Sequence, residues 1–84
     1  MSETVFVKYQ GQVSLDGFSC MDVNRSSFIR RVCYHDRKMT MVASLSGTYY
    51  AFCGVPGDVH QFFVSAPSMG KYFNSYIKGR YRCD

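Results

Sequence analysis

The chain has 84 residues, a formal net charge of +4, 46% hydrophobic residues and 17% aromatic residues. This length accommodates one small domain, and a charged fraction of 19% is too low for a disordered tail. No run approaches the roughly 20 apolar residues of a membrane-spanning helix. The N-terminus also lacks the basic and apolar stretches of a secretory signal. These features predict one soluble cytoplasmic domain over residues 1–84.

The N-terminal extension, residues 1–24, is predicted to be β-structured because apolar residues alternate along its start. The dipeptide Asp16-Gly17 separates two short apolar segments and is a two-residue hairpin signal. It predicts that residues 13–15 pair with residues 18–20. The apolar residues that share one face of the first strand are Val5, Val7 and Tyr9.

The middle of the chain predicts a three-stranded antiparallel meander. Three segments rich in apolar and aromatic residues cover residues 28–34, 39–45 and 48–53. A polar tetrapeptide separates the first two, and Ser46-Gly47 separates the last two. Short connections of this kind join antiparallel neighbours, so we expect the three strands to pair in chain order.

The turns set the predicted register of this meander. The second turn places Met41 opposite Phe52, and a first loop that closes directly after Tyr34 places Val32 opposite Met41 as well. Arg30 falls on the same face, so it either extends to an edge of the sheet or lies at a β-bulge that shifts the register. The residues predicted to share the core face are Phe28, Val32, Tyr34, Met39, Met41, Ala43, Leu45, Tyr50 and Phe52.

After Pro56 the apolar spacing changes from two to about 3.6 residues, which predicts two helices. The first ends before Pro67, and the second begins at the N-cap Ser68 and stops at Gly79. The residues predicted to face the sheet are Val59, Phe62, Phe63 and Ala66 in the first helix and Phe73, Tyr76 and Ile77 in the second. The predicted fold is α+β, an antiparallel sheet of four to six strands, N-terminal hairpin included, with two short C-terminal helices on one face.

The order and spacing of these residues resemble the KTSC domain, a short module named for its occurrence at the C-terminus of some lysyl-tRNA synthetases. The resemblance covers residues 25–82, and small bacterial and phage members consist of this module alone. Phe52 replaces the second tyrosine of the family's central Tyr-x-Tyr motif. The link of the KTSC family to a tRNA synthetase implies a nucleic-acid-binding role. The matching residues are Ser26, Ser27, Ile29, Val32, Tyr34, Gly47, Tyr50, Ala51, Phe52, Val55, Pro56, Val59, Ala66, Ser68, Gly70, Phe73, Asn74, Ile77 and Tyr81.

The aromatic residues Tyr50 and Phe52 are open to two interpretations. On an exposed sheet they would form a platform on which bases stack. The predicted register instead places both rings under the helices, which favours core packing against the helix residues. Tyr49, on the other face, is then expected to be more exposed to solvent.

Four cysteines, Cys20, Cys33, Cys53 and Cys83, stand 13, 20 and 30 residues apart and form no Cys-x-x-Cys pair. Such spacing does not predict a zinc site. Cys33 and Cys53 lie on the two outer strands of the predicted meander, beyond disulfide reach. We therefore expect reduced thiols that act as small hydrophobic residues, and the spacing does not decide whether Cys20 contacts Cys83.

No catalytic arrangement emerges from the remaining residues. His35 and His60 fall in a polar turn and on the outer side of the first helix, and no serine or cysteine stands at a spacing that pairs with either. Neither glycine-rich phosphate loop is present. The sequence therefore predicts no enzyme, no catalytic residue, no metal, no cofactor and no small-molecule substrate.

Basic and aromatic residues interleave over residues 71–82, where helical spacing turns Phe73 and Ile77 inward and leaves the lysines outward. Arg80 and Arg82 alternate with Tyr81 in an extended end, so both point the same way. The candidate nucleic-acid-binding residues are Lys71, Lys78, Arg80, Tyr81 and Arg82, with Arg30, Arg31 and Arg37 extending the surface.

A surface of this kind suits RNA, tRNA included. Two alternatives stay open: a protein-interaction adaptor that docks through an exposed edge strand or through the same basic face, and a basic helix end that complements the helix dipole without any ligand. The sequence predicts a small binding module, RNA-binding or adaptor, with no membrane partner.

Overall fold

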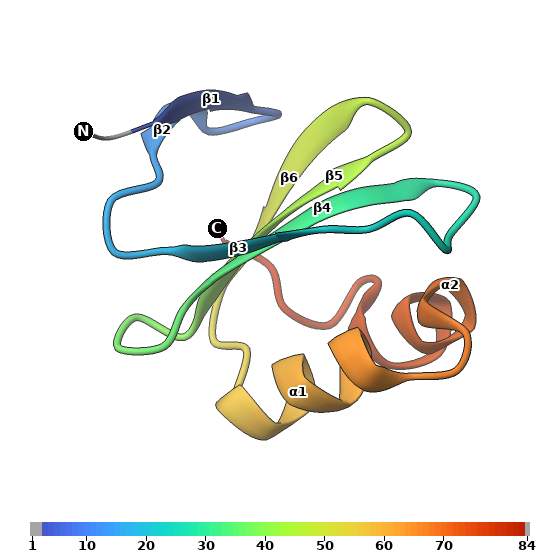
Figure 1. Ribbon diagram of the computed structural model, residues 1–84. Helices are drawn as coiled ribbons and strands as arrows, with labels where there is room; N and C mark the ends of the chain where they lie inside the picture. The colour runs from blue at the N-terminus through green and yellow to red at the C-terminus, as the bar shows by residue number, and fades with distance from the viewer. Residues whose placement is uncertain (1–2, 84) are drawn as a thin grey trace.

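The structure, a computed structural model, describes residues 3–83, which form a six-stranded sheet followed by helices (Figure 1). The strands are β1 (Thr4–Val7), β2 (Gly11–Ser14), β3 (Ser19–Asp22), β4 (Ile29–His35), β5 (Thr40–Leu45) and β6 (Thr48–Phe52). The helices are α1 (Gly57–Ser65) and α2 (Met69–Tyr72), which continues into the π-helical turn η1 (Phe73–Ile77). The predicted α+β class is confirmed. No helix in the described part of the chain is long and apolar enough to cross a membrane.

The strand order is β2-β1-β6-β5-β4-β3. All neighbours are antiparallel except β1 and β6, which are parallel and meet at Val7 and Tyr49. At that junction the backbone N–H of Lys8 donates to the carbonyl of Tyr49 at 2.9 Å. The sheet is therefore a β4-β5-β6 meander with the β1-β2 hairpin joined in parallel to β6 and the single strand β3 joined antiparallel to β4.

The meander was predicted in the right order but with one register error. Met41 pairs with Phe52 as expected, whereas Met41 pairs with Tyr34 and not with Val32. The four-residue loop between β4 and β5 lies one residue later in the chain than predicted, because His35 pairs with Thr40. Met39 therefore belongs to the turn, with φ of 48°, and is exposed. An error of two residues leaves the strand residues between the bulge and the Ser46-Gly47 turn on their predicted faces, since side chains alternate with a period of two. Val32, Tyr34 and Met41 are accordingly buried.

Of the two alternatives for Arg30, the β-bulge is the one present. The β4-β5 register shifts between Ile29 and Arg31, and Arg30 between them is exposed. The shift buries Ile29 completely and leaves Phe28 half-buried. The bulge thereby removes an arginine from the core face without breaking the strand.

The predicted Asp16-Gly17 hairpin is wrong. Asp16-Gly17 does form a turn, in which the N–H of Phe18 donates to the carbonyl of Leu15 at 3.0 Å. The flanking strands separate after it, because β2 pairs with β1 and β3 pairs with β4 at the opposite edge of the sheet. Each strand gains a partner that already belongs to a packed core, which an isolated two-stranded hairpin does not offer.

The sheet carries a core on each face. On one face α1, α2 and η1 cover the meander, as Figure 1 shows and as predicted. On the other face the β1-β2 hairpin covers β4, β5 and β6. The buried residues of this second core are Val5, Val7, Leu15, Cys33 and Val42. Tyr49 packs against it and is half-buried, so its predicted position in solvent is wrong.

Phe62 and Tyr76, predicted to face the sheet, are exposed instead, and so is Tyr9, predicted to share a strand face with Val5 and Val7. Tyr9 lies in the β1-β2 turn at a φ of 73° and is 86% exposed. Phe62 on α1 and Tyr76 on η1 are exposed as well. A nine-residue helix presents a narrow face, which Phe63 and Ala66 fill, and the wide π-helical turn rotates Tyr76 outward onto Tyr72.

The ends of the second helical segment follow the signals predicted from the sequence, whereas α1 ends at a contact with Arg25 that was not predicted. Ser68 caps α2 by accepting a hydrogen bond from the N–H of Lys71 at 3.3 Å, and Gly79 ends the helical region at a φ of 78°. The carboxyl end of α1 has no basic residue in its last turn. Arg25, which is far from α1 in the sequence, provides a basic group there and donates to the carbonyls of Val64 and Ala66, each at 2.8 Å. This contact ties the segment before β4 to the helical layer.

The expectation of reduced thiols is wrong, because the cysteines form two disulfides, Cys20–Cys33 and Cys53–Cys83. Cys20 and Cys33 face each other across β3 and β4. The predicted hairpin had paired Cys20 elsewhere and so concealed this contact. The second bridge forms because the C-terminal segment returns along β6, where the N–H of Cys53 donates to the carbonyl of Tyr81 at 3.1 Å.

Candidate nucleic-acid interface

The C-terminal tail, residues 79–83, forms one wall of the candidate site. It turns at Gly79 and runs beside the end of β6, where Cys83 forms a disulfide with Cys53, the residue that follows β6. The side chain of Gln10 also donates to the carbonyl of Cys83 at 3.4 Å. The tail, β6 and the β1-β2 turn therefore meet, although they are far apart in the sequence.

A tail groove of about 450 Å³ opens between these three segments. It contains two cations and three tyrosines, and none of the described residues that line it is acidic. The ammonium of Lys8 lies 5.4 Å from the ring centre of Tyr9 and 6.0 Å from that of Tyr50, which is cation–π range. The lining residues are Lys8, Tyr9, Gln10, Tyr50, Ala51, Phe52, Gly79, Tyr81, Arg82 and Cys83.

A second cavity of about 400 Å³, which we call the phenylalanine hollow, adjoins the tail groove. Four of its nine lining residues are aromatic, and its other polar residues are a serine, an asparagine and a lysine. Tyr50, Phe52 and Gly79 line both depressions, which makes them continuous. The lining residues are Phe28, Leu45, Ser46, Tyr50, Phe52, Phe73, Asn74, Lys78 and Gly79.

The comparison with known proteins identifies the family. A sequence model described as the KTSC domain matches residues 25–81. The chain belongs to the KTSC family. Its relatives include lysine–tRNA ligases from Nostoc punctiforme, 33% identical, and from Trichormus variabilis, 35% identical, each over 57 residues. Those matches cover 67% of this chain and 10% of each ligase, so the chain corresponds to a small part of these enzymes.

A solved structure gives the same assignment. The crystal structure of a KTSC domain protein from Yersinia pestis superimposes with a TM-score of 0.73 and 31% sequence identity. The match covers 80% of this chain and 94% of the Yersinia pestis chain. The KTSC core supplies the wall from β6 and most of the tail, whereas Lys8 and Tyr9 come from the hairpin that precedes residue 25.

The candidate nucleic-acid-binding residues predicted from the sequence divide into two groups by their position in this KTSC structure. Tyr81 and Arg82 line the tail groove, Lys78 lines the phenylalanine hollow, and Arg80 is exposed between them in the sequence. The others line neither depression. They are Lys71 on α2, Arg30 at the bulge, Arg31 on β4 and Arg37 in the β4-β5 turn.

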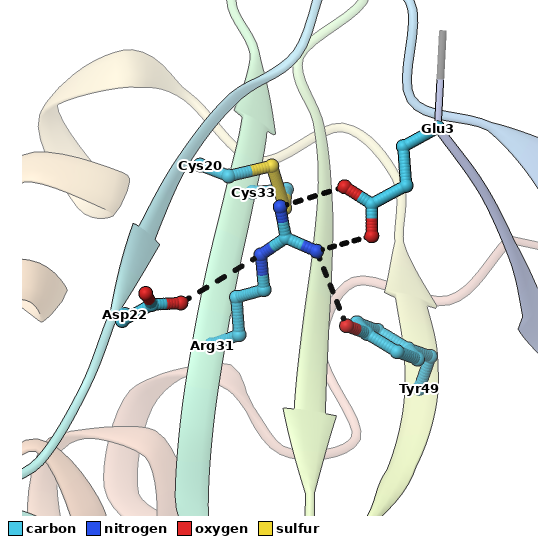
Figure 2. The surroundings of a disulfide bond; sticks show 6 residues. All are labelled: Glu3, Cys20, Asp22, Arg31, Cys33 and Tyr49. Carbon is cyan, nitrogen blue, oxygen red and sulfur yellow. Dashed lines mark hydrogen bonds and ion pairs between the residues drawn. A yellow bond between two sulfur atoms is a disulfide. The ribbon is translucent and has the colours of Figure 1, made fainter.

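Arg31 is engaged in an ion pair that holds the N-terminal segment to the sheet. Its guanidinium donates to both carboxylate oxygens of Glu3, at 2.6 and 2.8 Å, and to the hydroxyl of Tyr49 at 3.4 Å (Figure 2). The Asp22 carboxylate lies 3.9 Å away. The hydrogen bond from Arg31 lowers the pKa of Glu3, and the same bond raises the pKa of Arg31. This cation is thus neutralised by carboxylates within the fold.

Three groove residues were missed as site residues: Lys8, Tyr9 and Tyr50. Tyr50 was assigned to the core but is half-buried and lines both depressions. Phe52 is also half-buried, with its ring edge-on to Phe73 at 5.6 Å. No local pattern marks Lys8 or Tyr9, because they reach the site only through the parallel β1-β6 contact.

The remaining titratable side chains show packing roles. His60 stacks on Tyr34 with ring centres 4.2 Å apart, and burial lowers the pKa of His60. The hydroxyl of Tyr34 donates to the carbonyl of Val55 at 2.7 Å. Within residues 3–83 no cluster of three histidine, cysteine or acidic residues is arranged to hold a metal ion. The described site therefore offers cations, aromatic faces and amides.

Proposed function

We propose that this KTSC domain is a non-catalytic module that binds RNA in the tail groove. The observation that carries the proposal is the composition of the groove, in which Lys8 and Arg82 stand beside three tyrosines with no carboxylate among the described lining residues. Cations neutralise phosphates, and tyrosine rings stack on unpaired bases. Lys78 and Arg80 extend the positive surface along the same segment.

The relatives support an RNA ligand. The lysine–tRNA ligases that contain a similar segment are enzymes whose name states an RNA substrate. An RNA-binding accessory module fits such a protein. All four cysteines are in disulfides, so none of them is available as a thiolate nucleophile.

The salt dependence of binding tests the proposal. Each phosphate contact with a single strand contributes about −0.7 to the slope of log K against log salt, so three contacts give roughly −2. Fluorescence anisotropy with a labelled mixed-sequence RNA at two salt concentrations measures this slope. Replacing Lys8, Lys78 and Arg80 by glutamine should make the slope shallower. The triple change Arg30→Gln, Arg37→Gln and Lys71→Gln removes the same charge at residues that line neither the groove nor the hollow, and it should retain most of the slope.

The tyrosines give an independent measurement. Tyr9 is 86% exposed, so Tyr9→Ala should leave the fold intact. We expect this change to weaken binding by about 1–3 kcal/mol without altering the salt slope. Equal binding by all variants, or no binding at low salt, contradicts the proposal.

A protein-interaction adaptor is the second candidate, because β3 forms one edge of the sheet and its four residues are all exposed. An edge strand of this kind accepts an added strand from a partner. Affinity purification from lysate with and without nuclease distinguishes the candidates, since RNA-dependent capture disappears with nuclease.

A further inference from the structure

We infer that the phenylalanine hollow is a subsite for one unpaired nucleobase, and this inference rests on the proposed RNA-binding function. The hollow has a preformed aromatic wall. Phe73 is only 5% exposed. Its ring centre lies 6.2 Å from that of Phe28 and 5.6 Å from that of Phe52, and both contacts are edge-on. Phe28 and Phe52 are half-buried, so each keeps part of its ring accessible. A planar ligand can therefore contact aromatic surface without rearrangement of the core.

The polar residues of the hollow match the edge of a base. Asn74 is exposed, and no hydrogen bond joins its side chain to any other described residue. Its amide offers a donor and an acceptor side by side, which is the pattern that a base edge presents. The hydroxyl of Ser46 adds a group that donates or accepts. These groups select a ligand that is flat, apolar on its faces and polar at its rim.

Charge and continuity favour a base over an apolar peptide side chain. Lys78 stands at the hollow, and the tail groove with Lys8 and Arg82 continues from it through Tyr50 and Phe52. The described residues that line the two depressions include no carboxylate. A nucleotide strand carries a phosphate on each side of the inserted base, whereas an apolar side chain supplies no anion for these cations. A paired base is stacked inside a duplex and cannot enter, so the subsite selects single strands.

RNAs with one abasic nucleotide test the subsite in the 84-residue chain. A single-stranded RNA of about six nucleotides is a suitable length, and the abasic position is moved along it one nucleotide at a time. We expect one position, or two adjacent ones, to weaken binding roughly 5- to 150-fold while the salt slope is kept. The fully paired duplex of the same sequence should bind more weakly than the single strand.

Variants assign the effect to the hollow. Asn74→Ala should reduce the penalty of the sensitive abasic position, because the base has then lost its hydrogen-bonding partner. Ser75→Ala changes the next exposed residue, which does not line the hollow, and should leave the penalty unchanged. In NMR spectra the ring signals of Phe28, Phe52 and Phe73 should shift with intact RNA and not with the sensitive abasic RNA.

The outcomes separate the inference from the proposed function. Salt-dependent binding with no sensitive abasic position, or equal affinity for the duplex, overturns the subsite and leaves the RNA-binding proposal standing. No RNA binding at low salt overturns both. Ring shifts that persist with every abasic RNA also overturn the subsite.

Discussion

At the scale of single residues, the stacked pair of His60 and Tyr34 predicts how stability depends on pH. Burial lowers the pKa of His60 below its usual value of 6.5. The unfolded chain therefore takes up a proton first as the pH falls, and it then binds more protons than the folded chain. The free energy of unfolding should have its full value above about pH 6.5 and should decrease as the pH falls below 6.5. The pKa of Glu3 is lowered too, but its contribution is lost only below about 4.5.

Urea denaturation at about pH 7.5 and about pH 5.5 measures this effect, because histidine titrates between these values. His60→Phe keeps a ring against Tyr34 and should make the difference between the two midpoints smaller. His35→Gln removes the other histidine and should retain the dependence attributed to His60. An identical midpoint at both pH values in the unmodified protein contradicts the prediction.

Phe63 and Phe62 are adjacent on α1 and predict opposite responses to truncation. Phe63 is fully buried, with its ring 6.2 Å from those of Tyr72 and Phe73, whereas Phe62 is 59% exposed. Phe63→Ala should cost about 3–5 kcal/mol, a large part of the roughly 4–12 kcal/mol that stabilises a domain of this size. Phe62→Ala should change stability by no more than about 0.5 kcal/mol. Thermal denaturation of both variants checks the pair.

Phe52 provides a third comparison. The sequence predicts that its ring packs in the core, where truncation to alanine costs about 3–5 kcal/mol. Phe52 is half-buried, so its truncation removes less apolar surface than that of Phe63. If Phe52→Ala lowers the free energy of unfolding as much as Phe63→Ala does, the core extends into the phenylalanine hollow.

At the scale of elements, the two disulfides have different predicted effects on binding. Cys53–Cys83 closes a loop that contains α1, α2 and η1 and fixes the tail, whereas Cys20–Cys33 joins two neighbouring strands. Replacing both cysteines of either pair by serine should cost about 3–4 kcal/mol in stability. Only the Cys53→Ser/Cys83→Ser variant should also weaken RNA binding, because the tail is one wall of the groove.

The matched pair of double variants makes this prediction specific. Without its disulfide the tail keeps the hydrogen bond from Cys53 to the carbonyl of Tyr81 and the weaker one from Gln10. Anisotropy measurements below the unfolding transition compare the two variants in the folded state. Equal RNA affinities would show that packing of Tyr81 alone positions the tail.

At the scale of the whole molecule, both cores are built on the same three strands. Phe63 belongs to the core under the helices and Val7 to the core under the β1-β2 hairpin, yet each packs against β4, β5 and β6. We expect the two cores to unfold together in one transition. Val7→Ala, which costs about 2 kcal/mol, should therefore shift the same transition that Phe63→Ala shifts. Far-UV and near-UV circular dichroism should give coincident curves for both variants, and a separate early transition for Val7→Ala contradicts shared unfolding.

The sequence by itself determined the local elements and the faces of the meander. The turn at Ser46-Gly47, the cap at Ser68 and the stop at Gly79 act within a few residues, so their signals are complete in the local sequence. The alternation of side chains also made the core face insensitive to the two-residue register error at Met41. The basic segment with Lys78, Arg80, Tyr81 and Arg82 was found for the same reason, since its pattern is local.

Only the tertiary structure decided which distant segments meet. The turn at Asp16-Gly17 was read correctly, but the choice of strand partner depends on which core offers more buried surface. The parallel contact of β1 with β6 and the return of the tail brought Lys8, Tyr50 and Arg82 to one groove. The β3-β4 pairing created the Cys20–Cys33 disulfide, and the return of the tail created Cys53–Cys83. These contacts join residues that lie 13 to 73 positions apart, and their free energy depends on the packing of the whole fold and not on any local pattern.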